Sequence, residues 1–265
     1  MYSRLQLTGK YIRYFVTASN GRGHGIHSPF VYDFIKKVLR DKEEYECYKP
    51  IEEIRKRLNE DKQIIKVEDH GAGSAVLQTK DRVVGDMARS SLKSKKYAQL
   101  LFRIAKRYFP ATIIELGTSF GITTSYLASA NPGARVYTIE GSLSIASIAS
   151  GTFSSLSLHN IVLKTGGFEQ VLPSLLAGIP NADLVFIDGD HRKESTLTYF
   201  RQLLDHTSDT SIMVFDDIHW SREMEEAWGE IKLDSAVTLS IDLFFVGLVF
   251  FSKDFKTKQH FTIRY

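Results

Sequence analysis

From about Lys96 onward, short apolar runs rich in β-branched and aromatic residues alternate with segments of helical length. The runs are TIIEL, RVYTIE, NIVLKT, DLVFID and SIMVFD, followed closely by VTLSI and GLVFF. Five strands separated by helices indicate a mostly parallel sheet with helices on both faces. The last two runs are too close for a helical crossover, so we expect an antiparallel hairpin at one edge. The pattern predicts a doubly wound α/β fold with a seven-stranded sheet.

The first third of the chain has a different sequence pattern: residues 1–95 are rich in charge and show helical periodicity. Ser28 and Pro29 are a good helix start, since serine accepts a hydrogen bond from an amide of the first turn and proline has no amide to leave unpaired. Pro50 begins a second charged helical stretch. We therefore expect an N-terminal helical cap or lid over residues 1–95 and the main α/β domain over residues 96–265.

Composition and charge add few constraints. The chain has 265 residues, 43% of them hydrophobic and 25% charged, with a net charge of +3. Such values suit a soluble enzyme; they do not require a nucleic-acid partner, although they leave one open. The charge is uneven, because the chain before Asp33 holds no carboxylate. That segment favours either a solvated basic helix or an anionic partner, and its basic residues are Arg4, Lys10, Arg13 and Arg22.

The expected compartment is the cytoplasm. Cys47 is the only cysteine, so no intramolecular disulfide can form. Charges interrupt every turn of the N-terminal segment, which argues against a signal peptide. The longest apolar run, LFFVGLVFF, is about half the roughly 20 residues of a membrane span, so we expect no membrane partner. Exposed aromatic residues near the N-terminus leave a homodimer open.

A glycine-containing turn suggests a nucleoside site. In IIELGTSFGITTSYLA an apolar strand leads to Glu115, a loop with Gly117 and Gly121, and then a helix. Glycines let a backbone turn sharply near a ligand, and amides at a helix start suit a carboxylate or phosphate. The next strand ends in Glu140, about 20 residues further on, where an acid accepts hydrogen bonds from ribose in dinucleotide-binding folds. A tight turn without a ligand is the simpler alternative.

The loop lacks the G-x-G-x-x-G spacing typical of a pyrophosphate site. A carboxylate at Glu115 would repel a pyrophosphate and attract the ammonium of an amino acid. This charge argument favours S-adenosylmethionine over NAD.

Acidic residues gather at the ends of the next two strands. Asp188, Asp190 and His191 follow one strand, and Asp216 and Asp217 follow the next, with room for one helix between them. Crowded carboxylates repel one another, and a divalent cation would relieve that cost. Oxygen ligands favour Mg²⁺, with Ca²⁺ or Mn²⁺ also open. The alternative is that these residues only cap a helix and start a loop.

Five segments together resemble a known family. ELGTSFG, TIEGS, GGFEQVLPSL, FIDGDH and VFDDIH, in this order and spacing, are similar to class I S-adenosylmethionine-dependent methyltransferases, particularly the catechol O-methyltransferase-like group and its bacterial relatives. The resemblance covers roughly residues 96–251 and implies a Rossmann-like fold. It also implies cofactor contacts at Glu115, Gly117, Thr118, Ser119 and Gly121 for the methionine part, Glu140 and Gly141 for the ribose, Gly167 and Phe168 for the adenine, and Asp188.

The resemblance further implies a metal site. Asp188, Asp216 and Asp217 take the places of ligands that hold the ion, which chelates two neighbouring substrate oxygens. Asp188 and His191 are the implied catalytic residues. His191 replaces the lysine of the catechol enzymes as the base, and the ordinary pKa of a histidine, about 6.5, suits that task.

The expected function is methyl transfer to the hydroxyl of a small molecule with metal assistance. Three alternatives stay open: a metal-independent methyltransferase acting on nitrogen or on nucleic acid, a NAD-dependent oxidoreductase, and a noncatalytic module that only binds the cofactor. KVEDHGAGS at residues 66–74 imitates the cofactor turn, but no second strand ending in an acid follows at the right distance. We therefore interpret Asp69, Gly71 and Gly73 as part of a cap loop, and His24 and His27 as surface or core histidines.

Overall fold

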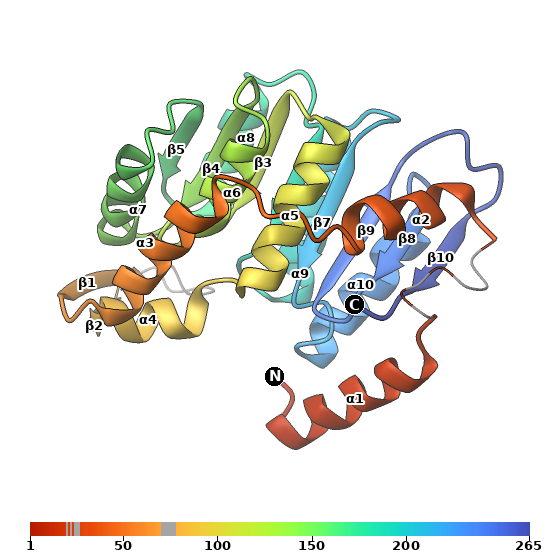
Figure 1. Ribbon diagram of the computed structural model, residues 1–265, viewed down its shortest axis with the longest axis horizontal. Helices are drawn as coiled ribbons and strands as arrows, with labels where there is room; N and C mark the ends of the chain where they lie inside the picture. The colour runs from red at the N-terminus through yellow and green to blue at the C-terminus, as the bar shows by residue number, and fades with distance from the viewer. Residues whose placement is uncertain (20, 22, 24–26, 70–77) are drawn as a thin grey trace. The chain divides into compact units, whose positions relative to one another are not determined.

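The computed structural model describes the whole chain except residues 20, 22, 24–26 and 70–77. The predictions for His24, Gly71 and Gly73 therefore lie outside the described residues. The chain divides into two compact units, each with its own part of the fold (Figure 1). Unit 1 comprises Met1–Asp41 and Ile179–Tyr265, and unit 2 comprises Lys42–Gly178. The division of the chain at residue 95 stays a prediction.

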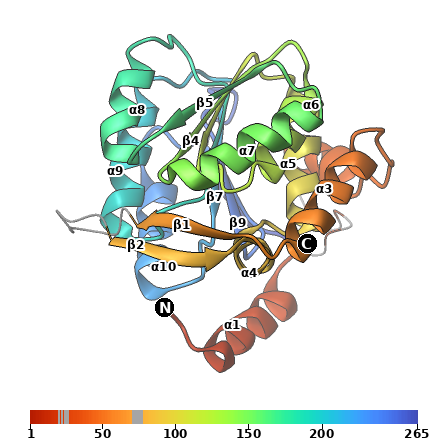
Figure 2. The ribbon, with the colours of Figure 1, turned by 90° about the vertical axis from the view of Figure 1, so that its left-hand side faces the viewer.

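Unit 2 contains three parallel strands in the order β3-β4-β5. They are β3 (Thr112–Leu116), β4 (Arg135–Glu140) and β5 (Ile161–Thr165). The helices of this unit are α3 (Tyr48–Glu60), α4 (Val84–Ser91), α5 (Lys95–Tyr108), α6 (Ile122–Ala130), α7 (Leu143–Ser155) and α8 (Phe168–Leu176). α7 packs against β4 and β5 (Figure 2). A separate antiparallel hairpin joins β1 (Ile64–Asp69) to β2 (Gln78–Val83) and contacts α7.

An aromatic cluster joins α3 to the helices beside the strands of unit 2. Tyr48 of α3 meets Phe102 of α5 and Tyr126 of α6 with ring centroids 5.1 and 5.4 Å apart, both in T-shaped geometry. Such pairs add about 0.5–1.5 kcal/mol each beyond the area that they bury. The charged helix predicted from Pro50 is thus α3, which begins two residues earlier and is packed through its aromatic first residue.

Unit 1 contains five strands in the order β10-β8-β9-β7-β6. They are β6 (Leu184–Ile187), β7 (Ile212–Asp216), β8 (Leu239–Asp242), β9 (Val246–Phe250) and β10 (Gln259–Thr262). β6 and β7 are parallel, whereas β9 is antiparallel to both β7 and β8. The helices of this unit are α1 (Arg4–Thr17), α2 (Pro29–Phe34), the π-helix η1 (Ile35–Leu39), α9 (Lys193–Leu204) and α10 (Arg222–Leu233).

The sequence predictions for these elements are largely confirmed. All seven strands are present, β8 and β9 pair as the antiparallel hairpin, and Ser28 caps α2 at the amide of Val31. β10 was missed, and it pairs parallel to β8, so the hairpin is not outermost in unit 1. QHFT has one aromatic residue among four and alternates between half-buried and exposed positions, so its pattern is weak. Within the described part of the chain, no helix has both the length and the apolar character to cross a membrane.

Candidate active site

The loop between β3 and α6 in unit 2 is shaped by left-handed backbone. Gly117, Ser119 and Gly121 have φ of 105°, 49° and 81°. A Cβ at Gly121 would lie 2.5 Å from a ring carbon of Phe153 on α7, besides being strained at this φ. Glycine at this position therefore lets the start of α6 approach α7.

The carboxylate of Glu140, at the end of β4, holds the loop after β3 and the start of α7. Its Oε2 accepts a hydrogen bond from the amide of Ser119 at 2.9 Å, and its Oε1 accepts one from the amide of Ser142 at 3.1 Å. A carboxylate oxygen has two lone pairs and can accept more than one hydrogen bond. The side chain is partly exposed at the end of β4. A carboxylate held in place by two amides and partly exposed at the end of a strand suits hydroxyl donors, as the sequence predicts for a ribose.

Glu115 is completely buried at the end of β3. Its Oε2 accepts hydrogen bonds from the hydroxyls of Thr124 and Thr138, the latter at 2.6 Å, and Thr138 lies 2.6 Å from the hydroxyl of Thr118. Within the described chain its Oε1 is buried without a hydrogen-bond partner. Burial raises the pKa of the Glu115 carboxyl to about 7. A buried carboxylate oxygen without a partner is costly, and a cationic ligand group nearby would offset that cost.

The residues expected at the adenine lie at the end of β5. Gly167 caps α8 and Phe168 is its first residue, and both are partly exposed, as is Gly141 after β4. Gly166, with a φ of 139°, donates its amide to the carbonyl oxygen of Glu140 at 2.9 Å. This bond joins the turn after β5 to the strand that carries Glu140, while the adenine role stays a prediction.

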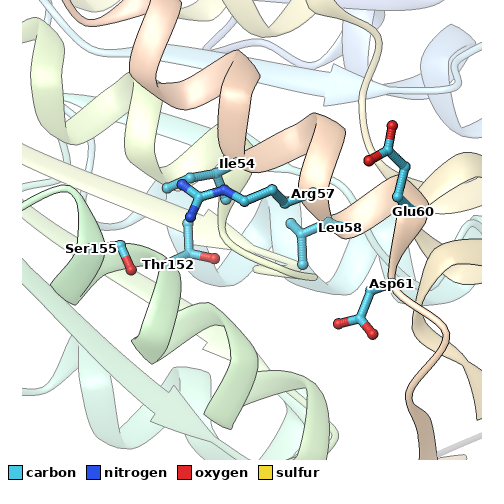
Figure 3. A pocket seen from close by; sticks show the side chains of 7 residues that line it. All are labelled: Ile54, Arg57, Leu58, Glu60, Asp61, Thr152 and Ser155. Atoms are coloured by element: carbon cyan, nitrogen blue, oxygen red, sulfur yellow. The ribbon is translucent and has the colours of Figure 1, made fainter.

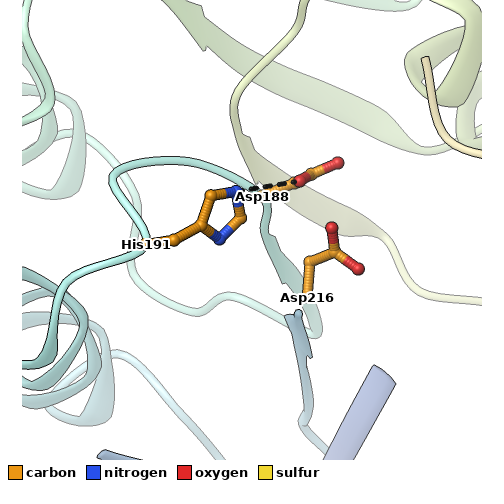
Figure 4. Close-up of side chains that lie close together, drawn as sticks. All are labelled: Asp188, His191 and Asp216. Carbon is orange, nitrogen blue, oxygen red and sulfur yellow. Dashed lines mark ion pairs between the residues drawn. The ribbon is translucent and has the colours of Figure 1, made fainter. Parts of the chain in front are cut away.

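A second group of predicted residues meets in unit 1. Asp188 follows β6 directly and Asp216 ends β7, and these strands are parallel neighbours with Ile187 opposite Phe215. Asp188, His191 and Asp216 each offer a ligand atom, and these atoms all lie within 4.8 Å of one another (Figure 4). His191 Nε2 is 3.8 Å from Asp188 Oδ1. Asp216 is 1% exposed, so its carboxyl is withdrawn from water.

Two carboxylates and an imidazole fit a divalent cation. Two ligand atoms at about 2.1 Å from one ion can be at most about 4.2 Å apart, so side-chain shifts of several tenths of an ångström would complete the site. The sequence predicts only oxygen ligands, whereas this group also contains an imidazole nitrogen. Mn²⁺ therefore suits the group as well as Mg²⁺.

Two acids of the same loops lie outside this group. Within the described residues Asp217, predicted as a ligand, is not one of its members. It has a φ of 52°, and its amide donates to the carbonyl oxygen of Phe245 at 2.7 Å. Asp190 instead pairs with the guanidinium of Arg192 through two bonds of 2.5 and 2.7 Å. Burial would raise the pKa of Asp190, but hydrogen bonds led by Arg192 outweigh it and hold the pKa below its usual value.

His219 plays a part that the sequence did not reveal. Its Nδ1 lies 3.0 Å from Glu225 and its Nε2 lies 2.9 Å from Asp242. Burial alone would lower the pKa of His219, but hydrogen bonds to the two carboxylates, led by Asp242, raise it above its usual value. The ring also stacks on Phe244 with centroids 5.1 Å apart. These contacts fix the loop that follows β7, and the partners lie 6 and 23 residues away, so no local pattern indicates them.

Among the described residues of unit 2, one cavity lies away from the predicted site and another borders it. One of about 310 Å³ contains none of the predicted site residues, and Figure 3 shows its lining: Ile54, Arg57, Leu58, Glu60, Asp61, Thr152 and Ser155. The other, about 280 Å³, is lined by Val67, Glu68, Lys80, Arg82, Met87, Ser90 and Ser91. The hydroxyl of Ser91 is 3.4 Å from that of Ser119, so the second cavity borders the glycine loop. Glu68 and Ser91 are thus neighbours of the candidate cofactor site that motif reasoning did not select.

Comparison with known protein families finds a similarity in the middle of the chain. Residues 114–218 match a family described as a methyltransferase domain, and this range includes Glu115, Glu140 and the Asp188–His191–Asp216 group. This match confirms the resemblance to methyltransferases seen in the motifs.

The relatives are named as O-methyltransferases. The transmembrane O-methyltransferases of Propithecus coquereli and Homo sapiens are each 33% identical over 94 residues, which is 34% of this chain and 34% and 32% of theirs. The chain thus matches about a third of the length of these curated relatives.

Solved structures confirm the doubly wound Rossmann-like fold. The O-methyltransferase TomG from Streptomyces achromogenes, in complex with S-adenosylmethionine (SAM), is 22% identical with a TM-score of 0.54, over 61% of this chain and 82% of that one. An O-methyltransferase from Bacillus cereus in complex with S-adenosylhomocysteine (SAH) is 18% identical with a TM-score of 0.56, over 83% and 97%. The SAH-bound methyltransferase PaMTH1 of Podospora anserina is 13% identical with a TM-score of 0.59, over 96% and 98%.

Proposed function

We propose that the protein transfers a methyl group from S-adenosylmethionine to a hydroxyl of a small-molecule acceptor, with help from a divalent metal ion, Mg²⁺ in the first instance. The observation that carries this proposal is that one matched methyltransferase domain contains both a fixed acid beside a glycine loop and a group of metal-ligand side chains. The names of the relatives support an oxygen acceptor.

The cofactor, when bound, supplies an activated methyl group. In the proposed site Glu140 accepts hydrogen bonds from the ribose hydroxyls, and its bonds to Ser119 and Ser142 hold it in place. Glu115 provides negative charge for the ammonium of the methionine part, with its accepting oxygen held by Thr124 and Thr138. The turn from Gly117 to Gly121 lets the cofactor approach the backbone.

A divalent ion, when bound, supplies Lewis acidity that makes an acceptor hydroxyl easier to deprotonate. Asp188 and Asp216 are the ligands that the geometry supports best, since they end neighbouring strands. We assign His191 to the base and not to the ion, because a protonated imidazole cannot bind a cation. His191 would accept the hydroxyl proton on an imidazole nitrogen, and the nearby Asp188 carboxylate would stabilise the resulting imidazolium. We retain Asp217 as a proposed third ligand that would have to turn toward the group. The cytoplasm remains the proposed compartment.

The decisive experiment is a calorimetric titration of SAH into the protein, in Mg²⁺ and again in EDTA, followed by a screen of vicinal diols and phenols with SAM. Micromolar binding, about −8 kcal/mol, and methyl transfer that EDTA abolishes would support the whole proposal. Binding with transfer that survives EDTA would favour a metal-independent methyltransferase. Binding of NAD but not of SAH would overturn the proposal.

The affinity for SAH is expected to rise with pH up to about 7. The pKa of Glu115 in the free protein is about 7, and a bound ammonium would lower it, so binding releases a proton below that pH. The dissociation constant should therefore fall by nearly tenfold per pH unit below pH 7 and level off above it. Calorimetry across this range measures the effect, and Glu115→Gln should make the profile flat. A wild-type profile as flat as that of the variant would contradict the role of Glu115.

The same raised pKa affects the stability of the free protein with a definite sign. The carboxyl ionises near 4.5 when unfolded and only near 7 when folded. Between these values the unfolded state releases the proton more readily, so the free energy of unfolding decreases as pH rises through that window. This trend is opposite to that of a salt-bridged carboxylate.

A further inference from the structure

α1 in unit 1 has two apolar faces, of which the fold uses one. The inner face packs Leu7, Tyr11, Tyr14 and Ala18 against Phe244 and Phe245. The hydroxyl of Tyr14 also donates to the carbonyl oxygen of Ile263. In the middle of α1, Lys10 pairs with Glu225 at 3.0 Å, and Tyr2, just before the helix, donates its hydroxyl to the same carboxylate at 2.7 Å. These contacts hold α1 in a defined orientation.

The outer face of α1 is apolar and open to solvent. Leu5, Ile12 and Val16 lie on one side of the helix, because their spacings of seven and four residues are close to whole turns. They are 86%, 57% and 71% exposed. Phe15, 47% exposed, lies at the edge of this stripe, where the guanidinium of Arg264 is 4.3 Å from its ring centroid. In Figures 1 and 2 this helix lies at the margin of unit 1, with one side turned away from the rest of that unit.

Basic residues border the stripe on both sides. Arg4 and Arg13 are exposed, and they lie roughly 80–100° around the helix from Leu5 in opposite directions. α1 contains no acidic residue. We call Leu5, Ile12, Phe15 and Val16, together with Arg4 and Arg13, the outer stripe of α1.

We propose that the outer stripe of α1 binds the surface of a bilayer that contains anionic lipid. A helix with an apolar face flanked by basic residues is suited to lie in the interface, with the apolar side chains among the acyl chains and the arginines at the headgroups. Two copies of this chain packed through the same stripe would bring four arginines together with no carboxylate from α1 to neutralise them. Charge complementarity therefore favours a lipid surface over a second copy.

This inference does not depend on the proposed methyl transfer. It departs from the expectation of no membrane partner, which was based on spanning runs alone. The contact proposed here lies along the surface and needs no spanning helix. The inner-face contacts would keep α1 packed against the rest of unit 1 while the outer stripe is bound to the bilayer.

The test is flotation of the full chain with vesicles of phosphatidylcholine alone or mixed with phosphatidylserine. Binding should require phosphatidylserine and weaken as salt increases, because the Debye length shortens. Arg4→Gln combined with Arg13→Gln should lower the partition coefficient on the mixed vesicles by roughly thirtyfold, from the loss of two charges near the surface. Ile12→Glu and the uncharged Leu5→Ser should each lower it by about tenfold or more.

The control variant is Thr198→Glu, which adds the same charge as Ile12→Glu at an exposed position of α9. It should bind vesicles like the wild type, and unchanged melting temperatures should show that every variant is folded. Equal binding of wild type and Ile12→Glu would overturn the proposal. So would a dimer, seen by light scattering, that Ile12→Glu dissociates while no form binds vesicles.

Discussion

Replacing Asp216 by asparagine is expected to lower kcat/KM for methyl transfer by about a thousandfold, and Asp188→Asn should do the same. Each change keeps the shape of the side chain and removes one of the two proposed anionic ligands at the ends of β6 and β7. A metal ion stabilises a transition state by several kcal/mol, and a loss of about 4 kcal/mol corresponds to this factor. Steady-state kinetics as a function of Mg²⁺ concentration would measure both the rate and the apparent metal affinity.

The controls separate a ligand role from a folding defect. Asp209→Asn removes an exposed aspartate of unit 1 that pairs only at the surface with Lys253, so activity should be unchanged. The melting temperature of Asp216→Asn without metal should not fall, because the change relieves repulsion with Asp188. Calorimetric titration of SAH into Asp216→Asn should give the wild-type affinity. Full activity of Asp188→Asn in EDTA would refute a metal site at this position.

Asp217→Asn tests a point on which sequence and structure differ. The resemblance assigns Asp217 a ligand position, whereas the structure groups Asp188 and Asp216 with His191. A loss of activity that excess Mg²⁺ restores would support the turned conformation of Asp217. Wild-type activity of Asp217→Asn would indicate that Asp217 is not a ligand, and that His191 is the third side chain near the ion.

The strands and their ends could be predicted from the sequence because they depend on local pattern. Apolar runs of four to six residues marked β3 to β9, and parallel strands bring their carboxyl ends to one edge, which is why Asp188 and Asp216 meet. The Glu140 position followed from the same rule. β10 was not predicted, because its four residues have little apolar character and its pairing with β8 is decided by tertiary contacts.

Side-chain partners were not predictable in the same way. Nothing local distinguishes Asp190, which pairs with Arg192, from Asp188, which lies beside His191 and Asp216. The difference arises at Asp190 itself, where a φ of 52° turns the chain. The bonds of His219 to Glu225 and Asp242 likewise depend on how α10 and β8 pack, which a single sequence does not specify.

Glu140→Ala is expected to weaken SAH binding by at least about a hundredfold. Hydrogen bonds to a charged group contribute about 1.5–3 kcal/mol each, so losing two from ribose hydroxyls costs about 3 kcal/mol or more. The variant also removes the acceptor for the amides of Ser119 and Ser142, which loosens the turn after β3. Glu140→Gln keeps one accepting oxygen and should lose about tenfold. Calorimetry with both variants would measure these steps.

A matched ligand separates direct contact with ribose from a loosened loop. The 2′-deoxy analogue of SAH lacks one of the hydroxyls that Glu140 would bind, so it should lose affinity for the wild type but little further for Glu140→Ala. If Glu140 acted only by holding the amides of Ser119 and Ser142, the analogue and SAH would lose affinity equally in the variant. Glu169→Gln, at an exposed position in the first turn of α8, is the control with the same charge change. Wild-type affinity of Glu140→Ala for SAH would contradict a ribose site at the end of β4.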